Sequence, residues 1–385
     1  MMWEKVKLGD IASFSNGINF NKTAYEKGVK LIGVSNFGDR FYPDYLQLQE
    51  VKKDIVRPED CLRNGDIVFV RSNGNKELVG RCMLVKNPTE RVTYSGFCIR
   101  ARLNDTDRYD PVYFTYYFKS KAFRRAVSGT AVGANIQNLS QARLSNHDCN
   151  VPDIETQHRI ADILSAYDDL IENNQKQIKL LEEAAQRLYK EWFVDLHFPG
   201  HENTKIVDGV PEGWIKEEIG KIIKKVHRTK QIVASEYKDE GSIPIVDQSR
   251  AFVAGYTNDL EARVDFGIPI IVFGDHTRIV KLIQFPFAKG ADGTQLIISD
   301  CLEMPQRLLY CSIMNVDLSN YHYARHFKYL KEEKIMIPTV EVANEFENNV
   351  TGIFSKIQNC RDEIIRCQKT RDLLLPKLMS GEVEV

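Results

Sequence analysis

The sequence predicts an α+β protein in which two β-rich domains are joined by two long antiparallel coiled-coil helices, arranged as a pseudo-two-fold internal repeat. Three observations predict this fold class. The same short motifs recur in the two halves of the 385 residues. Apolar residues spaced alternately four and three apart follow a proline in each half. Short apolar runs bounded by Gly, Asn and Asp occupy the rest of both halves.

The repeat is marked at both of its ends. Trp3 and Trp214 are each followed, five and six residues later, by an aliphatic residue and a glycine, and 211 residues separate the two tryptophans. Pro152 and Pro338 each precede a long helical pattern, and 186 residues separate the two prolines. The second copy is therefore 25 residues shorter than the first. The difference must fall in the middle of the repeated unit, because the ends are kept.

The two helical patterns predict a coiled coil within one chain, because each keeps one apolar seam facing a partner helix. The first seam comprises Ile160, Leu164, Tyr167, Ile171, Asn174, Ile178, Leu181, Ala185, Leu188 and Trp192. The second seam comprises Phe346, Val350, Ile353, Ile357, Cys360, Ile364, Cys367, Arg371, Leu374 and Leu378. Asn174 is the kind of polar seam residue that sets helix register. The seams alone would equally suit a dimerisation or packing device.

The helix ends are predicted from capping and breaking residues. Asp153 and Thr339 are expected N-caps, each directly after a proline. Pro199-Gly200 is expected to stop the first helix, and Pro376 with Gly381 to break the second. A first helix from near residue 154 to near residue 195 would be about 60 Å long, which exceeds one turn of DNA.

The globular parts lie before each helix. Strands are expected at 66–70, 93–99, 268–273 and 295–298, and an aromatic-rich helix at 111–118 that packs on the first sheet. The predicted domains are residues 1–150, a helical region at 151–200, residues 201–335 including a linker at 201–212, and a second helical region at 336–385.

Composition excludes several classes of protein. No apolar run approaches the about 20 residues that span a bilayer, and the first residues lack the apolar stretch of a signal peptide, so a cytoplasmic protein is expected. The eight cysteines form no CxxC pair, which argues against a zinc ribbon or a redox dithiol. The net charge of -1 gives no general basic excess, so a nucleic-acid interface would have to be local or completed by another subunit.

No residue is assigned to catalysis or to a metal. Asp110-Pro111-Val112-Tyr113 lacks the second proline of the Asn/Asp-Pro-Pro-Tyr loop of amino-methyltransferases, and ordinary helix capping explains it. The pairs His197/His201 and His322/His326 have metal-ligand spacing but no HExxH glutamate and no third ligand nearby. Phosphate-binding GxxxxGK[ST] and hydrolase GxSxG motifs do not occur.

Polar and basic residues on loops beside strands are the candidates for DNA contact, because base edges and phosphates require such donors. In the first half they are Arg71, Ser72, Asn73, Asn75, Lys76, Arg124, Arg125, Asn135, Gln137 and Asn138. In the second half they are Lys225, Arg228, Gln248, Arg250, His276, Arg278, Lys289 and Arg325, with Lys224 and Lys230 completing a basic cluster. A solvated surface role is the alternative for each; their clustering on loops in both halves favours DNA.

Taken together, these features resemble the specificity subunit of type I restriction-modification enzymes. The likeness rests on the tryptophan with its aliphatic-glycine pair in each half, on Asn64-Gly65-Asp66-Ile67 before a strand, and on the prolines that precede both helices. Trp192-Phe193 and Pro211-Glu212-Gly213-Trp214 look like the family's junction between halves. The opening of the second helix departs from the pattern, because Ala343 stands where the first helix has Gln157.

The resemblance implies a protein whose two target-recognition domains each recognise half of a split site in double-stranded DNA, with the helices measuring the spacer between them. It implies two methyltransferase subunits docked on the helices and restriction subunits beside them. S-adenosylmethionine, ATP and magnesium would belong to those partners, with no cofactor in this chain and no membrane.

Rival functions remain open on the sequence alone. A self-contained DNA methyltransferase would need a cofactor-binding fold that the sequence does not display. A two-domain DNA-binding regulator or a coiled-coil scaffold would act without a methyltransferase partner. A specificity subunit of a type IIB enzyme would share the features described above.

Overall fold

The computed structural model describes residues 3–38, 40–73, 78–128, 138–226, 229–321 and 325–385. The chain divides into two compact units: residues 1–173 with 363–385 form unit 1, and residues 174–362 form unit 2. Each unit therefore contains one globular part and a segment of both long helices. The unit boundaries fall inside the helices rather than at the helix ends, where the sequence analysis placed domain limits.

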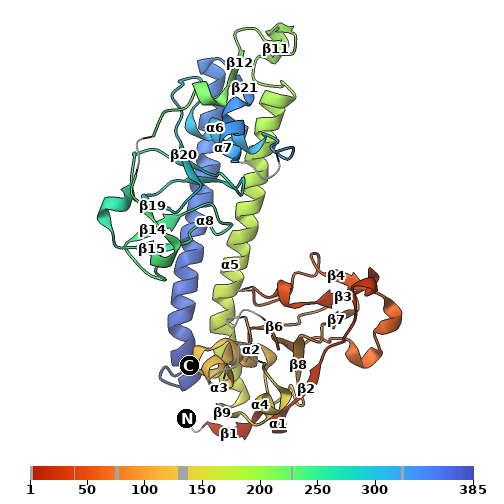
Figure 1. Cartoon of the computed structure of the whole chain (residues 1–385). Coiled ribbons are helices and arrows are strands. Elements are labelled where there is room, and N and C mark those ends of the chain that lie inside the picture. Colours follow the sequence, from red (N-terminus) through yellow and green to blue (C-terminus); the bar gives the residue numbers. More distant parts are fainter. Residues whose placement is uncertain (1–2, 39, 74–77, 129–137, 227–228, 322–324) are drawn as a thin grey trace. The chain divides into compact units, whose positions relative to one another are not determined.

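Unit 1 is built on three antiparallel or mixed sheets (Figure 1). Its strands are β1 (Glu4–Lys7), β2 (Ala12–Asn16), β3 (Tyr25–Ile32), β4 (Gln49–Val51), β5 (Ile67–Val70), β6 (Cys82–Leu84), β7 (Val92–Tyr94), β8 (Cys98–Leu103) and β9 (Asp148–Val151). They form the sheets β2-β8-β5-β6, β4-β3-β7 and β1-β9. Its short helices are α1 (Leu8–Ile11), α2 (Pro111–Lys119), α3 (Lys121–Ser128) and α4 (Gln141–Ser145), with 3-10 turns at Lys22–Ala24, Val34–Asn36, Lys53–Ile55 and Pro58–Asp60. The expected strand at 93–99 is in fact two strands, β7 and β8, because a turn interrupts it.

Unit 2 has the same kinds of element. Its strands are β10 (Ile206–Val207), β11 (Val210–Pro211), β12 (Ile215–Glu218), β13 (Gln231–Ile232), β14 (Ile243–Val246), β15 (Gly255–Thr257), β16 (Arg263–Val264), β17 (Ile270–Gly274), β18 (Val280–Ile283), β19 (Phe287–Gly290), β20 (Thr294–Ile297) and β21 (Lys334–Ile337). They form the sheets β18-β17-β20, β13-β19-β14-β15 with β16 on β19, β12-β21 and the hairpin β10-β11. Its short helices are α6 (Gln306–Met314) and α7 (His326–Glu332), with 3-10 turns at His201–Asn203, Ile219–Lys221, Ala234–Glu236 and Leu260–Ala262.

The internal repeat is present in three dimensions. The antiparallel pair β1-β9 of unit 1 corresponds to β12-β21 of unit 2, at the sequence spacings of the repeated motifs. The amide of Leu8 donates to the backbone carbonyl of His147 at 2.9 Å, and the amide of Ile219 donates to the backbone carbonyl of Glu333 at 2.9 Å. Close packing requires a glycine after each aliphatic residue. A Cβ on Gly9 would lie 2.9 Å from the carbonyl oxygen of Ser145 in α4, and a Cβ on Gly220 would lie 3.0 Å from the carbonyl oxygen of Lys331 in α7. The pseudo-two-fold repeat is confirmed.

The one departure noted between the halves has a structural counterpart. Gln157 is buried, and its amide accepts from the amide of Asp110 at 2.9 Å and donates to the carbonyls of Arg108 at 3.1 Å and Pro152 at 2.8 Å. Ala343 in the second helix is buried in an apolar cluster and can make none of these bonds. The connection between globular part and helix is therefore polar in unit 1 and apolar in unit 2.

The long helices are α5 (Ile154–Tyr189), which continues through a π-helical turn at Lys190–Val194, and α8 (Val340–Ser380). They pack antiparallel: in unit 1 Asp168 pairs with Arg371, and in unit 2 Glu182 pairs with Arg361 at 2.8 Å. Most seam positions are buried or partly buried in both helices. Asn174 is 2% exposed, as a register-setting seam residue requires.

Helix ends agree with the sequence in part. Asp153 caps α5 through a 2.8 Å bond from the amide of Thr156, which confirms it as an N-cap and lowers the pKa of its carboxyl group. The expectation that Pro376 breaks the second helix is wrong, because α8 runs on to residue 380. A proline so near the C-terminus removes a single hydrogen bond in the last turns, and the helix stops instead at Gly381, which has φ 73°.

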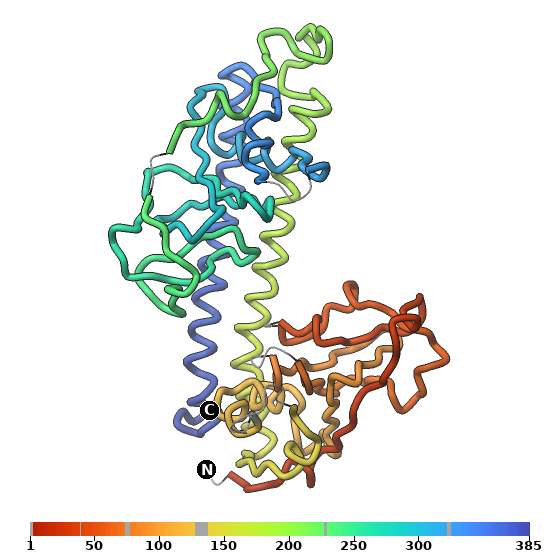
Figure 2. Tube along the Cα trace, viewed as in Figure 1, coloured from red at the N-terminus to blue at the C-terminus, as the bar shows by residue number. Residues whose placement is uncertain are grey.

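The core of each unit joins its globular part to its helices. In unit 1 the aromatic residues of α2 are buried together with Ile160, Leu164 and Leu378 from the long helices. In unit 2 the apolar face of α6 is buried with Phe346 and Val350 of α8. Trp3, which precedes β1, lies against Gly381, which follows α8, within unit 1. Figure 2 shows the two ends of the chain on the same side of this unit. Among the described residues, no helix combines the length and apolarity needed to cross a bilayer.

Candidate nucleic-acid interface

Two predicted DNA-contacting loops of the first domain meet at one point. Ser72 and Asn138 form an isolated antiparallel bridge, and the amide of Leu139 donates to the carbonyl of Arg71 at 2.9 Å. The Arg71 guanidinium donates to the carbonyl of Gly96 at 3.3 Å. The structure thus brings Arg71 and Ser72 together with Asn138, which is 66 positions beyond Ser72 in the sequence. Asn73 follows them on the same loop and is partly exposed.

An exposed aromatic side chain lies beside this bridge. Phe97 is 62% exposed in the turn between β7 and β8, and its carbonyl accepts from the amides of Arg71 and Ser72. A large apolar side chain facing solvent next to polar donors can contact a thymine methyl group or wedge between bases. The sequence gives no local signal for this residue, because its apolar neighbours predict one continuous strand over 93–99.

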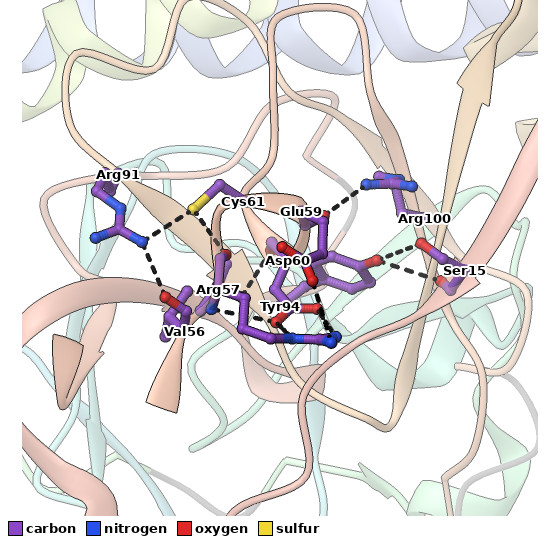
Figure 3. A network of polar contacts seen from close by, with 10 residues as sticks. Ser15, Val56, Arg57, Glu59, Asp60, Cys61, Arg91, Tyr94 and Arg100 are labelled. Atoms are coloured by element: carbon purple, nitrogen blue, oxygen red, sulfur yellow. Dashed lines mark hydrogen bonds and ion pairs between the residues drawn. The ribbon is translucent and has the colours of Figure 1, made fainter. Parts of the chain in front are cut away.

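Other arginines of the first domain hold the fold itself (Figure 3). Arg57 makes bonds of 2.9 and 3.1 Å to the carboxylate of Asp60, which lower the pKa of that carboxyl group. Arg91 donates to the carbonyl of Val56 at 3.0 Å, and Arg100 donates to the carbonyl of Glu59 at 3.2 Å. The Arg57 pair thus holds the segment 56–61 in its own turn, and Arg91 and Arg100 fix that segment to the strands β7 and β8 beside it.

The remaining predictions for the first domain are placed differently. Arg125 is exposed on α3. Arg124 lines a cavity of about 710 Å³ in unit 1, together with Lys119 and Arg371, and neither Arg71 nor Asn138 belongs to that wall. Asn75, Lys76, Asn135 and Gln137, and Arg228 of the second domain, lie outside the described residues.

Three predicted loops of the second domain converge on Gln248. Its side-chain amide donates to the carbonyl of Asp292 at 2.8 Å and accepts from the amide of His276 at 3.1 Å. The hydroxyl of Thr277 donates to the carbonyl of Gln248 at 2.7 Å. A Cβ at Gly293, which has φ 83°, would lie 2.8 Å from the Gln248 amide, so only glycine fits there. Gln248 therefore acts first as the brace that joins the loops.

The basic members of this loop cluster are exposed, as are Thr277 and Asp292. Arg250 and His276 are exposed, and Arg325 is exposed directly before α7. Arg278 is also exposed but has φ 60°, and its guanidinium donates to the carbonyl of Leu318 at 3.0 Å. Arg250, His276 and Arg325 are thus the side chains that this surface offers to a ligand.

A buried lysine supports the loop from within the domain. Lys281 is 5% exposed, and its ammonium donates to the carbonyls of Asp247 at 2.8 Å and Ala251. The Asp247 carboxylate lies 4.0 Å away. Burial lowers the pKa of Lys281 from 10.5 to about 8. The ammonium group connects both ends of the loop that carries Gln248 and Arg250.

A second feature of this domain is a cavity of about 820 Å³ with lysines in its wall. Lys225 and Lys289 were predicted as DNA contacts, and the structure brings them together there with Lys224 and Lys331. Lys230, which the sequence placed in the same basic cluster, is absent from this wall. It pairs instead with Asp259 at 2.7 Å and Glu261 at 2.9 Å, so its charge is neutralised away from the cavity.

The motifs examined for catalysis have structural roles. Asp110 caps α2 by accepting from the amides of Val112 at 3.0 Å and Tyr113 at 3.3 Å, which confirms the capping interpretation. Both ring nitrogens of His326 lie 2.9 Å from backbone carbonyl oxygens, so neither faces an open site. His322 lies outside the described residues. Within the described ranges no group of three His, Cys, Asp or Glu side chains could hold a metal ion.

Comparison with known proteins defines the class of this chain. Residues 2–183 match the family described as the type I restriction modification DNA specificity domain. Over most of its length the chain is similar to the specificity subunits of type I restriction-modification systems.

Two curated relatives and one solved structure illustrate the similarity. The type I restriction enzyme MjaIX specificity subunit of Methanocaldococcus jannaschii is 29% identical over 335 residues, which cover 80% of this chain and 76% of the relative. The HindI specificity subunit of Haemophilus influenzae is 30% identical over 208 residues, covering 50% of this chain and 41% of the relative. The crystal structure of a type I S subunit from M. genitalium shares the fold, with a TM-score of 0.58 at 16% identity and coverage of 98% and 96%.

Proposed function

We propose that this chain recognises a bipartite target in double-stranded DNA through its two domains and carries out no chemical step of its own. The observation that carries the proposal is the duplication: two domains of the same construction each present clustered polar loops within one specificity subunit. Each domain would recognise one half of the target, so the two half-sites need not share a sequence.

The first half-site would be contacted by the surface around the Ser72–Asn138 bridge, including Arg71 and Phe97. The second would be contacted by Arg250, His276 and Arg325 on the loops that Gln248 joins. Phe97, Asn138, Arg250, His276 and Arg325 are exposed and Arg71 and Ser72 are partly exposed, so these segments offer the polar and apolar groups that base recognition requires.

Two methyltransferase subunits would dock on the long helices, and restriction subunits would join the complex through them. S-adenosylmethionine would be bound by the methyltransferase subunits, and ATP and magnesium by the restriction subunits. The proposal therefore expects the purified chain to bind no S-adenosylmethionine. Calorimetric titration checks this, and stoichiometric binding by the chain alone would instead favour a self-contained methyltransferase.

The decisive experiment is co-expression with the methyltransferase subunit of the same system, followed by mapping of methylated adenines on a plasmid. The expected result is a stable complex and one bipartite methylated motif that disappears when this chain is omitted. Methylation that persists without the chain, or failure to form a complex, would contradict the proposal and favour a regulator or a scaffold.

A further inference from the structure

Four lysines from three separate segments line one cavity in the second domain, and we refer to Lys224, Lys225, Lys289 and Lys331 as the lysine hollow. Lys224 and Lys225 precede β13, Lys289 lies on β19, and Lys331 lies on α7. Thr229, Gln231 and Gln295 line the same cavity and add neutral hydrogen-bonding groups. The tertiary structure has thus gathered four positive charges that are up to 107 positions apart in the chain.

The charges of the hollow are not neutralised from within. Its wall, as far as the described residues form it, contains no Asp or Glu. Lys224 lies 3.7 Å from Asp300 at the edge, whereas the described residues give Lys225, Lys289 and Lys331 no carboxylate within 4.0 Å. Like charges that line one cavity repel one another, and of the four described lysines Lys224 alone has a carboxylate within 4.0 Å, so a bound anion would stabilise this arrangement.

Lys289 shows the effect most clearly, because it is half-buried. Burial alone lowers its pKa, and no carboxylate offsets that change. Lys230 in the same domain is the contrast, since its two ion pairs raise its pKa. An ammonium group that has lost part of its hydration without gaining a partner is suited to bind an anionic ligand.

The hollow adjoins the loops that would recognise bases. Strands β19 and β20 and the turn between them supply Lys289 and Gln295 to the hollow and Gly293 to the Gln248 cluster. A Cβ on Gly290 would lie 2.6 Å from the Cβ of Asp247, so residue 289 is next to the loop that carries Arg250. In DNA the phosphates flank the base edges of each groove, so a protein that contacts bases needs cationic groups beside its base-contacting loops.

We propose that the lysine hollow binds the DNA phosphodiester backbone next to the second half-site and positions the second domain on it without selecting bases. This inference rests on the proposed function. It assigns the hollow to the phosphates and leaves base selection to the exposed side chains of the loop cluster.

The test uses the full chain in complex with its methyltransferase subunits and a duplex that contains the mapped motif, with a scrambled duplex beside it. Affinity is measured for Lys225→Gln, Lys289→Gln, Lys331→Gln and the triple variant over salt concentrations from about 50 to 200 mM. Each lost phosphate contact should reduce the slope of log affinity against log salt by about 0.9. Binding should weaken by a similar factor on both duplexes, and the methylated motif should stay the same.

Lys230→Gln is the matched control, because it removes a lysine of the same domain that is neutralised by Asp259 and Glu261. Its salt slope should equal that of the wild type. A triple variant with the salt slope of the wild type would overturn the proposal. A changed methylated motif would also overturn it, because it would mean that these lysines contact bases. If Lys289→Gln does not fold, as judged by its melting temperature, the exposed Lys225 and Lys331 decide the question. A wild-type complex that does not distinguish the two duplexes would contradict the proposed function rather than the hollow.

Discussion

At the scale of single residues, chemical type alone does not separate a DNA-contacting side chain from a structural one. Gln248 has the amide that commonly pairs with adenine, yet both ends of that amide already bond to neighbouring loops. Lys281 is a cation that solvent scarcely reaches. Both residues shape the loop surface from below, so their replacement should act on DNA binding through the geometry of the loops.

The titration of Lys281 gives a prediction about stability. Because its pKa is about 8 in the folded protein and 10.5 in the unfolded chain, the unfolded state binds more protons between these pH values. The free energy of unfolding contributed by this group should therefore rise with pH across that window, by at most about 3 kcal/mol. Urea unfolding of wild type and Lys281→Met at pH 7.5 and 9.5 measures it. The free energy of unfolding of Lys281→Met should lack this rise with pH, whereas that of Lys230→Met should keep it. The same pH dependence in wild type and Lys281→Met would refute the lowered pKa of Lys281.

Gly293 provides a second residue-level prediction. Gly293→Ala places a Cβ 2.8 Å from the Gln248 amide, so it should separate the loops and weaken binding to a target with an intact second half-site. Gly267→Ala is the control, because Gly267 also has a positive φ, 69°, but meets no atom within 4 Å. In both variants an alanine at positive φ costs about 1–2 kcal/mol of stability. The difference in DNA affinity between the two variants therefore reports the contact of residue 293 with Gln248. Equal DNA affinity in the two variants would rule out the brace.

Phe97 is the corresponding test in the first domain. Phe97→Ala should lower affinity for the first half-site by roughly 5- to 30-fold, the equivalent of about 1–2 kcal/mol, if the ring contacts a base step. Thermal melting should be unchanged, because the ring is mostly exposed. Leu46→Ala, which removes another exposed side chain of the same domain, should leave DNA affinity intact. A loss of affinity for the second half-site alone would contradict the contact of Phe97 with the first half-site.

At the scale of elements, the long helices belong to the cores of the two units. Their seam residues pack with the globular parts as well as with each other, since the cluster that contains Leu164 and Leu378 also contains the aromatic residues of α2. The Asp168–Arg371 pair is bonded further to the hydroxyl of Tyr116 at 2.5 Å, which ties α2 to both helices. A coiled coil built in this way should not unfold independently of the domains.

The seam yields a prediction with a neighbouring control. Ile171→Glu should destabilise the chain by several kcal/mol, because it removes a buried aliphatic side chain worth about 1.5–3 kcal/mol and buries a charge. Leu170→Glu, one position away and 44% exposed, should change the melting temperature little. Ile178→Glu in the other unit should resemble Ile171→Glu with a smaller effect, because Ile178 is only partly buried. Equal melting of the 170 and 171 variants would contradict the seam.

At the scale of the whole molecule, the duplication predicts that half of the chain can replace the whole. A fragment truncated after about residue 200 keeps the first domain and α5 but exposes the seam that α8 covers. Burial of that seam favours a homodimer. The dimer should methylate a symmetric target made of two copies of the first half-site when the methyltransferase subunit is present. Sedimentation and methylation mapping measure both outcomes, and a monomeric, inactive fragment would count against the duplication.

The repeat, the α+β class, the two long helices and the approximate positions of β5, β17 and β20 are all predictable from the sequence. These features depend on local spacing: the alternation of four and three residues, the capping of Asp153 and Asp110, and the glycines that adjoin α4 and α7 leave their marks within a few residues of where they act. The resemblance to a family of specificity subunits followed from the same local marks.

Which polar residues share a surface depends on long-range folding and is visible in the three-dimensional structure alone. Lys225 and Lys289 belong to one cavity while Lys230 does not, and Ser72 pairs with Asn138 across 66 positions of sequence. It also showed that Gln248 and Lys281 hold the loops and that Pro376 lies within α8. The physical reason is that side-chain partners are set by long-range packing of strands and loops, in which burial and competing ion pairs determine which charges remain available to DNA.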